Sequence, residues 1–259
     1  MSTLVEIEYR SPAAILILNR PDKRNALNRE LITALRLALV QQRDISTVRC
    51  IILTGAGKAF CAGMDLDELQ ASQNAKQEQL HEDAQNLGRL FDELTNYPKP
   101  TIAAVNGPAF AGGAGLVSMC DLAIAVPQAK IGYPEVRRGL VAAMVMPHLL
   151  RLVGERMARY LLLTGEPIEA DQAVRSGLIN QIADNGYLMP SALAMASLLS
   201  EGGPEAIQQT KELLFKLRHS PLTFDQLVEQ SVLPRFREES REGLAAFFSQ
   251  IPTPWSHRS

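Results

Sequence analysis

Two short stretches decide the fold of this chain: Phe60-Cys61-Ala62-Gly63-Met64-Asp65, residues 60–65, and Gly107-Pro108-Ala109-Phe110-Ala111-Gly112-Gly113, residues 107–113. Each is a small, glycine-containing loop that follows an apolar, strand-like run and precedes a helix-like run. Loops of this kind can present bare backbone N–H groups at the start of a helix, where the helix dipole favours negative charge. Two such loops facing one another could hold an oxyanion, and the carboxylic acid of Glu135 could move protons beside it.

Strand-like and helix-like segments alternate along the chain around these loops. Apolar residues that alternate with polar ones, or that run together, predict strands at residues 5–9, 13–18, 50–53, 101–105, 122–126 and, most weakly, 179–182. Apolar residues that recur every three or four positions predict a helix capped by Asn28, a long helix that ends before Pro98, and a small-residue helix at residues 112–119. This recurrence predicts an α/β fold and disagrees with a β-sandwich or a helix bundle.

The last third of the chain differs, because its strand signal nearly ends after about residue 145. Pro204 and Pro221 stand where helices can begin, and the leucines and phenylalanines that follow give helical faces. We therefore expect a core over residues 1–190 and a C-terminal α-helical region over residues 191–259. Such a region is a frequent place for contacts between subunits.

The composition is that of a globular protein with an ordinary surface. The chain has 259 residues, of which 46% are hydrophobic and 21% charged, enough for one sizeable core. Its net charge of -2 provides no basic surface for nucleic acid or for an anionic membrane. Scattered cysteines without a C-x-x-C pair indicate reduced thiols. Since residues 1–6 lack a signal-peptide pattern and no apolar run reaches ~18 residues, we expect a cytoplasmic protein.

Three other kinds of site find little support in the residues. Cys61 could act as a nucleophile, but no histidine lies near it in the sequence. Gly57-Lys58 is similar to part of a phosphate-binding loop, yet Ala59 stands where that motif needs Ser or Thr. The histidines lack metal-ligand spacing, so no metal site is expected at His81, His148, His219 or His257.

In this order and at this spacing, the two loops resemble those of the crotonase superfamily, also called the enoyl-CoA hydratase/isomerase family. The resemblance runs from about Leu18 to Ile182, with fainter support to Trp255. The matching blocks are Leu18 to Asn28, Leu53-Thr54-Gly55, Ala59 to Leu66, Ala104-Val105-Asn106-Gly107, Gly112-Gly113, Met119-Cys120-Asp121, Pro134-Glu135-Val136 with Gly139, and Leu163 to Ile168 with Ala173 and Gly177-Leu178-Ile179.

The resemblance implies a fold, an assembly and a ligand. The fold is a crotonase-like spiral of repeated β-β-α units, whose C-terminal helical region assembles a homotrimer or a dimer of trimers. The ligand is a coenzyme A thioester that serves as the substrate, with no separate cofactor. In the family two backbone N–H groups form an oxyanion hole, and by position they belong to Met64 and Gly112. The positions around the CoA and acyl moieties match Lys23, Arg24, Ala26, Ala62, Met64, Asp65, Leu66, Gly112 and Leu140.

The chemistry of a thioester suits two fixed backbone donors. Its carbonyl gathers negative charge when the α-carbon becomes carbanion-like, and two N–H groups stabilise that enolate. The cationic pair Lys23 and Arg24 could meet phosphates, although a solvated turn would explain the same charges.

The carboxylates distinguish this chain from the family's hydratases. Those hydratases resemble one another in having two glutamates, whereas this chain has Glu135 at one of the two positions and Gly115 at the other. Water addition needs water activation and proton delivery, most simply from two groups, but moving a double bond needs one base that takes a proton and returns it elsewhere. We therefore expect an enoyl-CoA isomerase in which Glu135, with a pKa raised by an apolar setting, carries the proton.

The residues leave several alternatives open. Hydration by a single glutamate is the nearest one, followed by a decarboxylase or a carbon–carbon lyase of the same family. A non-catalytic CoA-thioester binder is a different class, and the missing glutamate motivates it. Asp67 or Glu68 could replace that glutamate, although the first turn of a helix is reason enough for both. Glu135 could also be a surface carboxylate paired with Arg137 or Arg138.

Two further segments bear on the ligand. The apolar run at residues 139–146 favours an apolar acyl chain and also fits the buried entry to a helix. Near the C-terminus, residues 249–252 replace the lysine-rich segment that is common in the family, so a phosphate contact from that region is not expected.

Overall fold

The computed structural model describes residues 3–256 of the chain. Its main sheet has six strands in the order β1-β2-β3-β4-β6-β9. β1 and β2 pair antiparallel, and every other neighbouring pair in this sheet is parallel. The strands are β1 (Val5–Arg10), β2 (Ala13–Leu18), β3 (Cys50–Gly55), β4 (Thr101–Val105), β6 (Leu122–Ala125) and β9 (Gln181–Ile182).

A smaller sheet of three short strands has the order β5-β7-β8. Its strands are β5 (Ala109–Phe110), β7 (Lys130–Gly132) and β8 (Ile168–Glu169). β5 belongs to the second glycine loop, so its pairing with β7 anchors that loop. The sequence pattern did not predict these strands, because a run of two or three residues is too short to show a period.

Helices connect the strands and cover the main sheet. They are α1 (Arg29–Arg43), α2 (Leu66–Ser72), α3 (Gln77–Thr95), α4 (Gly112–Met119), α5 (Met146–Thr164), α6 (Ala170–Arg175), α7 (Leu188–Ser200), α8 (Pro204–His219), α9 (Phe224–Val232) and α10 (Glu238–Ser249). Single 3-10 turns occur at η1 (Pro21–Lys23), η2 (Pro134–Arg138) and η3 (Leu233–Phe236).

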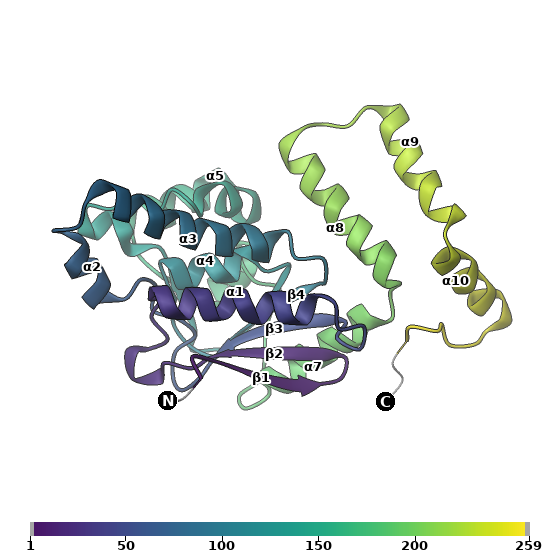
Figure 1. Cartoon of the computed structure of the whole chain (residues 1–259), viewed down its shortest axis with the longest axis horizontal. Helices are drawn as coiled ribbons and strands as arrows, with labels where there is room; N and C mark the ends of the chain where they lie inside the picture. Colours follow the sequence, from purple (N-terminus) through teal and green to yellow (C-terminus); the bar gives the residue numbers. More distant parts are fainter. Residues whose placement is uncertain (1–2, 257–259) are drawn as a thin grey trace.

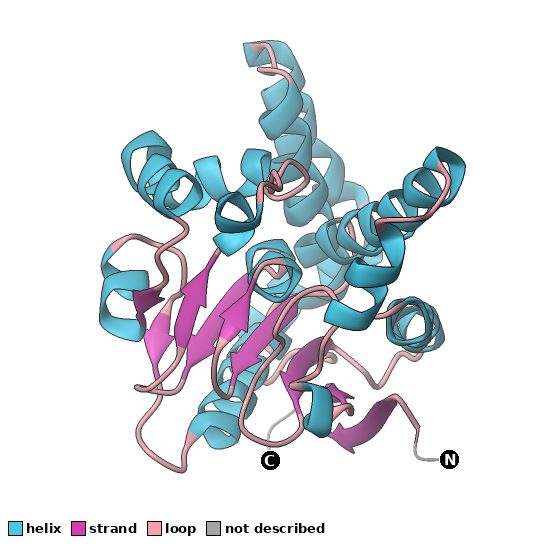
Figure 2. Cartoon of the chain, turned by 90° about the vertical axis from the view of Figure 1, so that its left-hand side faces the viewer, coloured by secondary structure: helices cyan, strands magenta, loops and turns pink. Residues whose placement is uncertain are grey.

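Side chains of the main sheet alternate between two buried faces. On one face, Leu16 and Leu53 belong to the large core that α1, α3 and α4 complete. On the other face, Ile15 and Ile52 pack in a second cluster with Ala192 of α7. Figure 2 shows the sheet between these helical layers. Strands that are covered on both faces carry continuous apolar runs, which is why the sequence predicts β2, β3 and β4.

Several predicted elements are confirmed to the residue. The strands at residues 13–18 and 101–105 and the helix at residues 112–119 begin and end where the pattern placed them. The side chain of Asn28 accepts a hydrogen bond from the Leu31 N–H at 3.0 Å, as the N-cap of α1.

One expectation for the second half of the chain is wrong, and another holds only in part. Pro221 does not begin a helix, because α9 begins at Phe224, where Thr223 closes a capping box with Gln226. The entry to α5 at residues 139–145 is a loop that is buried only in part, since its N-cap Val145 is 3% exposed but Val141 is 72% exposed.

The helices α8, α9 and α10 form an arm that stands apart from the body of the molecule (Figure 1). An ion pair between Lys211 of α8 and Asp121 ties the arm to the body. Asp121 also accepts the Thr101 N–H at 2.8 Å, so this carboxylate orders the start of β4. Because α7 packs on the sheet, the expected boundary between residues 190 and 191 falls inside a helix of the body.

Candidate active site

Backbone hydrogen bonds hold the first glycine loop between two other segments. The N–H of Leu27 donates to the Gly63 carbonyl at 2.7 Å, and the N–H of Asp65 donates to the Leu27 carbonyl at 2.9 Å. On the other side, the N–H of Phe110 donates to the Cys61 carbonyl at 2.9 Å. The first loop is therefore fixed between the chain ahead of α1 and the second glycine loop.

Two asparagine side chains brace the start of the first loop. The amide nitrogen of Asn25, a fully buried residue, donates to the Ala59 carbonyl at 2.8 Å. The side-chain oxygen of Asn106 accepts the Gly55 N–H at 3.1 Å, and its nitrogen donates to the Gly57 carbonyl at 3.1 Å. An amide can both donate and accept, which suits it to a loop whose backbone groups face inward.

This arrangement leaves two N–H groups without a protein acceptor. Within residues 3–256, neither the Met64 N–H nor the Gly112 N–H donates a hydrogen bond. Gly112 is the first residue of α4, where the helix itself offers no carbonyl. A Cβ added to Gly63 would lie 3.3 Å from the Gly112 nitrogen, so the two loops are in direct contact. Two unpaired donors on touching loops can receive one developing oxyanion.

Ala111 sets the direction of the second donor through an unusual backbone conformation. Its φ of 49° and ψ of -121° lie in a region that alanine rarely enters. Its own N–H donates to the Gly132 carbonyl at 2.9 Å. A Cβ on Gly63 would lie only 2.7 Å from the Ala111 methyl, so residue 63 must be glycine, as its φ of +89° also requires.

These groups open onto a cavity of about 730 Å³. All the residues named from the sequence as catalytic or substrate-binding line it, namely Lys23, Arg24, Ala26, Ala62, Met64, Asp65, Leu66, Gly112, Glu135 and Leu140. Segments that are far apart in the sequence therefore form a single site.

Lys23 and the acidic residues near it at one end of the cavity form ion pairs. Lys23 Nζ lies 2.7 Å from Asp67 Oδ2, and Arg20 Nη2 lies 2.8 Å from Asp65 Oδ2. Burial opposes ionisation of Asp65, but the hydrogen bonds from Arg20 and the Asp67 N–H outweigh it and hold its pKa below the usual range. Glu68 accepts the backbone N–H of Arg29 at 3.1 Å. Glu68 does not line the cavity, and Asp67 lines it in an exposed ion pair with Lys23, so neither stands as a second carboxylate opposite Glu135.

Glu135 reaches the cavity from η2. Its Oε2 atom is buried and has no hydrogen-bond partner in the described part of the chain. Burial raises the pKa of Glu135, and the nearby Arg138 opposes this shift without cancelling it. Arg137 instead pairs with Glu166 and donates to the Thr164 carbonyl at 2.9 Å. The alternative that Glu135 forms a surface ion pair with Arg137 or Arg138 is therefore wrong, and its carboxyl group is free to contact a ligand in the cavity.

The position of the missing glutamate is filled by other side chains. A Cβ on Gly115 would lie 2.7 Å from the Phe91 ring and 2.9 Å from the Val145 side chain. Phe91 comes from α3 and Val145 from the loop ahead of α5, and both line the cavity. The wall beside Glu135 is thus apolar where a second carboxylate would stand.

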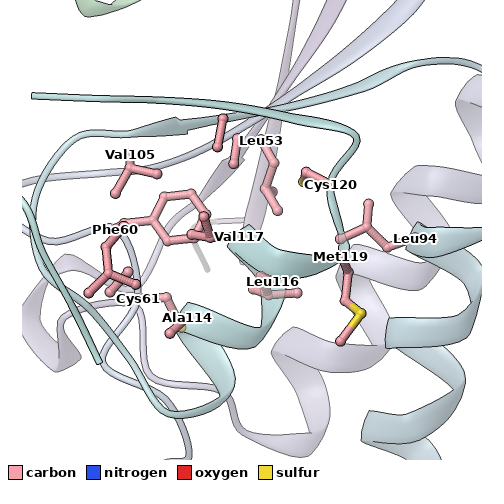
Figure 3. Close-up of a cluster of buried hydrophobic side chains, with 14 of the residues drawn as sticks. Leu53, Phe60, Cys61, Leu94, Val105, Ala114, Leu116, Val117, Met119 and Cys120 are labelled. Atoms are coloured by element: carbon pink, nitrogen blue, oxygen red, sulfur yellow. The ribbon is translucent and has the colours of Figure 1, made fainter. Parts of the chain in front are cut away.

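The Cys61 thiol is not a candidate nucleophile. It lies in the buried cluster beneath α4 with Phe60 and Val117 (Figure 3). Burial raises the pKa of Cys61 to about 12, so the thiol stays protonated at neutral pH.

The residues that the structure describes hold neither a metal-ligand cluster nor a membrane-spanning helix. There, no three His, Cys, Asp or Glu side chains gather as a metal ion would need. None of the helices in that part of the chain combines the length and apolarity that crossing a membrane requires. His257 and the side chain of His219 lie outside the described residues.

The sequence assigns no role in the site to three residues that the structure places there. In the sequence, Phe91 is recognisable only as one apolar residue on a helix face. Its contact with Gly115 depends on how α3 packs. Ala111 gives no signal beyond its position before Gly112. Arg138 does give one, because it stands three residues after Glu135 in what proves to be a 3-10 turn.

The fold and the site together define a class of protein. The structure is similar to that of an enoyl-CoA hydratase from Shewanella pealeana, with a TM-score of 0.92 and 32% identity over 97% of this chain and 96% of that one. The fold is therefore the crotonase α/β fold.

Sequence comparison agrees with the structure. Residues 10–258 match the enoyl-CoA hydratase/isomerase family. The chain is 41% identical to a Thermus thermophilus protein with a provisional enoyl-CoA hydratase name, over 96% of this chain and 99% of the relative. It is 32% identical to the crotonyl-CoA hydratase of Syntrophomonas wolfei, over 94% of each chain. The chain belongs to the enoyl-CoA hydratase/isomerase family of enzymes.

Proposed function

We propose that this enzyme is an enoyl-CoA isomerase, which moves a carbon–carbon double bond with Glu135 as its acid–base group. The observation that carries the proposal is the wall at Gly115, where Phe91 and Val145 leave no room for a second carboxylate. A single acid–base group is sufficient to shift a double bond, whereas adding water is done most simply by two groups.

The reaction follows from the groups that line the cavity. The thioester oxygen of a 3-enoyl-CoA accepts the N–H groups of Met64 and Gly112. Glu135 removes a proton from the α-carbon, and the electron pair moves onto the thioester oxygen as an enolate. The protonated Glu135 then returns the proton to the γ-carbon, while the double bond forms between the α- and β-carbons. Fixed N–H donors stabilise the enolate most, because the charge develops at their position.

The state of Glu135 supports this role. Burial raises the pKa of Glu135 above that of a free carboxyl, the direction that suits a group which must both take and give a proton. Its unpartnered Oε2 keeps a lone pair for a substrate proton.

The test supplies a 3-enoyl-CoA and, separately, a 2-enoyl-CoA to the purified enzyme. Thioester absorbance follows the double bond, and product mass detects the addition of water. We expect the 3-enoyl substrate to give a 2-enoyl product of unchanged mass. A gain of one water by the 2-enoyl substrate, without any shift of the 3-enoyl one, would reject the isomerase.

Hydration by Glu135 alone is the second candidate, and the names of the relatives favour it. Those relatives are named hydratases, including the crotonyl-CoA hydratase of Syntrophomonas wolfei. In the same assay this function predicts a hydrated product from the 2-enoyl substrate. A decarboxylase or a carbon–carbon lyase would leave both substrates unchanged, because neither carries a carboxylate on the α-carbon or an oxygen on the β-carbon.

A non-catalytic CoA-thioester binder is the remaining alternative. It predicts acyl-CoA binding without turnover across the substrate panel. We propose that CoA enters as part of the substrate, with its phosphates toward Lys23 and Arg24, and that no separate cofactor takes part.

The C-terminal arm supports assembly into a homotrimer or a dimer of trimers. Phe224, Phe236, Phe247 and Phe248 are 71–79% exposed on the arm, more apolar surface than an isolated protein normally leaves in water. Sedimentation of the wild type and of Phe247→Ser/Phe248→Ser tests this proposal, and the variant should shift toward monomer. A reducing, cytoplasmic compartment suits the buried free thiols of Cys50, Cys61 and Cys120.

A further inference from the structure

Arg138 is a cation beside the proposed catalytic base. Glu135 and Arg138 are three residues apart within η2. In a 3-10 helix, which has three residues per turn, side chains at this spacing lie one above the other on the same face. Both residues line the cavity. Arg137, two residues after Glu135, instead points toward Glu166 and the Thr164 carbonyl.

The guanidinium of Arg138 has no protein partner. Arg138 is an exposed residue at the mouth of the cavity, and within residues 3–256 it makes neither an ion pair nor a side-chain hydrogen bond, unlike Arg137. It lies near enough to Glu135 to lower that group's pKa, yet the two do not form an ion pair. The neighbouring Arg137 binds two acceptors, Glu166 and the Thr164 carbonyl, and Arg138 binds neither of them.

The other charged groups of the cavity lie among the residues assigned to CoA. Lys23 is paired with Asp67, and Asp65 is paired with Arg20. Arg24 makes no ion pair within residues 3–256, so it is a second unpaired cation, at the CoA end of the cavity. Between Arg138 and α5 the wall is formed by apolar residues, including Leu140, Val141 and Met144. This part of the cavity therefore combines an apolar surface with one unpaired cation.

We infer that the substrate's acyl chain ends in its own carboxylate, which Arg138 binds. The substrate is then a monothioester of a dicarboxylic acid, and its apolar methylene groups lie against residues 140–145. A guanidinium presents two parallel N–H donors that match a carboxylate, and such charge-assisted bonds are among the strong ones. This inference rests on the proposed acyl-CoA site, and it amends the expectation of a wholly apolar acyl chain.

Binding of saturated thioesters tests the inference without depending on which reaction occurs. Succinyl-, glutaryl- and adipyl-CoA are compared by calorimetry with butyryl-, valeryl- and hexanoyl-CoA, which match them in chain length. We expect at least one dicarboxylic member to bind about tenfold more tightly than its neutral counterpart, as a charge-assisted hydrogen bond contributes. Arg138→Met should remove this preference and leave the neutral thioesters' affinity unchanged. Arg138→Lys should retain part of it.

Arg137→Met is the matched control, because it removes an adjacent arginine that pairs outside the cavity, and it should keep the preference. Equal or weaker binding of every dicarboxylic member by the wild type would overturn the inference while leaving the acyl-CoA site intact. A loss of affinity in Arg138→Met that is equal for both series would also overturn it, and would assign Arg138 to a CoA phosphate. If no thioester binds, the proposed function and this inference fail together.

Discussion

The cavity has two walls of opposite character. The loop wall, formed by residues 23–27, 62–67 and 110–112, is held by backbone hydrogen bonds and by the ion pairs of Lys23 and Asp65, which surround the unpaired N–H groups of Met64 and Gly112. The η2 wall, formed by residues 134–145, is an exposed apolar loop that carries the unpartnered Oε2 of Glu135 and the unpaired Arg138.

This difference suggests that the loop wall positions the substrate and the η2 wall reacts with it. On the loop wall, the partners of the surrounding atoms fix where the Met64 and Gly112 N–H groups lie, so they need no reorganisation when charge develops. On the η2 wall, groups without partners keep their hydrogen-bonding capacity for the substrate. Substitutions on the loop wall should therefore move the N–H groups of Met64 and Gly112. Substitutions on the η2 wall should remove a group that contacts the substrate directly.

The largest effect is expected from Glu135→Gln, which keeps the shape of the η2 wall but removes its base. The kcat for a 3-enoyl-CoA should fall by about 10²–10⁴-fold with little change in KM, as loss of a general acid–base group produces. Glu166→Gln, which changes a glutamate outside the cavity, is the control and should keep kcat. Full activity in Glu135→Gln would remove Glu135 from the mechanism.

Gly63→Ala should produce the next largest effect, by moving the loop wall. Its Cβ would lie 2.7 Å from both the Ala111 methyl and the Phe110 carbonyl, so the second donor must shift. We expect kcat to fall by about 10²–10³-fold, the loss seen when one oxyanion donor is removed.

Gly57→Ala separates this displacement from backbone strain alone. Gly57 also has a left-handed φ, of +75°, but its added Cβ would meet only Pro21. It should lose stability in chemical denaturation and keep kcat. A kcat loss as large as that of Gly63→Ala would show that strain, and not donor position, explains both variants.

Gly115→Ala should act on stability, because Phe91 already fills the space. Overpacking of this kind costs about 1–3 kcal/mol in free energy of unfolding. Phe91→Leu in the same chain should recover part of the loss, and a double-mutant cycle from urea unfolding measures the coupling. Gly88→Ala in α3 is the control, since its Cβ would make an ordinary 3.5 Å contact with Met144. Independent effects at positions 115 and 91 would contradict the packing argument.

Ala111→Gly should have a smaller and opposite effect on stability. Glycine adopts the φ of 49° without strain, whereas alanine does not. Glycine also raises the conformational entropy of the unfolded chain, but this cost is smaller than the strain that is removed. We therefore expect the free energy of unfolding to rise by about 1 kcal/mol. The kcat should fall, because the peptide that carries the Gly112 N–H becomes freer. Thermal unfolding and steady-state kinetics measure the two changes, and an unchanged kcat would show that the methyl does not position the donor.

The smallest effect concerns pH. Since the folded state raises the pKa of Glu135, its contribution to stability is full below the unfolded-state pKa and is lost as the pH rises through the folded-state pKa. Glu135→Gln does not titrate, so it should gain stability relative to the wild type at neutral pH and lose this advantage in acid. A difference that is constant with pH would show that burial does not perturb Glu135.

The sequence predicted the loop wall better than the η2 wall. The glycines, asparagines and apolar strands of the loop wall leave a local signature, because backbone conformation and strand burial constrain each residue type. The η2 wall depends on contacts between distant segments. The place of Phe91 against Gly115 comes from the packing of α3 on α4, and no pattern within either helix records it.

By itself, the sequence determined the α/β class, the two glycine loops, Glu135, and the absence of a glutamate at position 115; only the family resemblance points to Met64 and Gly112 as oxyanion donors. These are properties of residue type and order, which local sterics and hydrogen bonding translate directly into backbone shape. Only the tertiary structure decided that Phe91 closes the space at Gly115, that Asp67 is paired with Lys23, and that Arg138 stands unpaired beside Glu135. Those facts depend on which side chains meet across the cavity, and only the packing of distant segments brings them together.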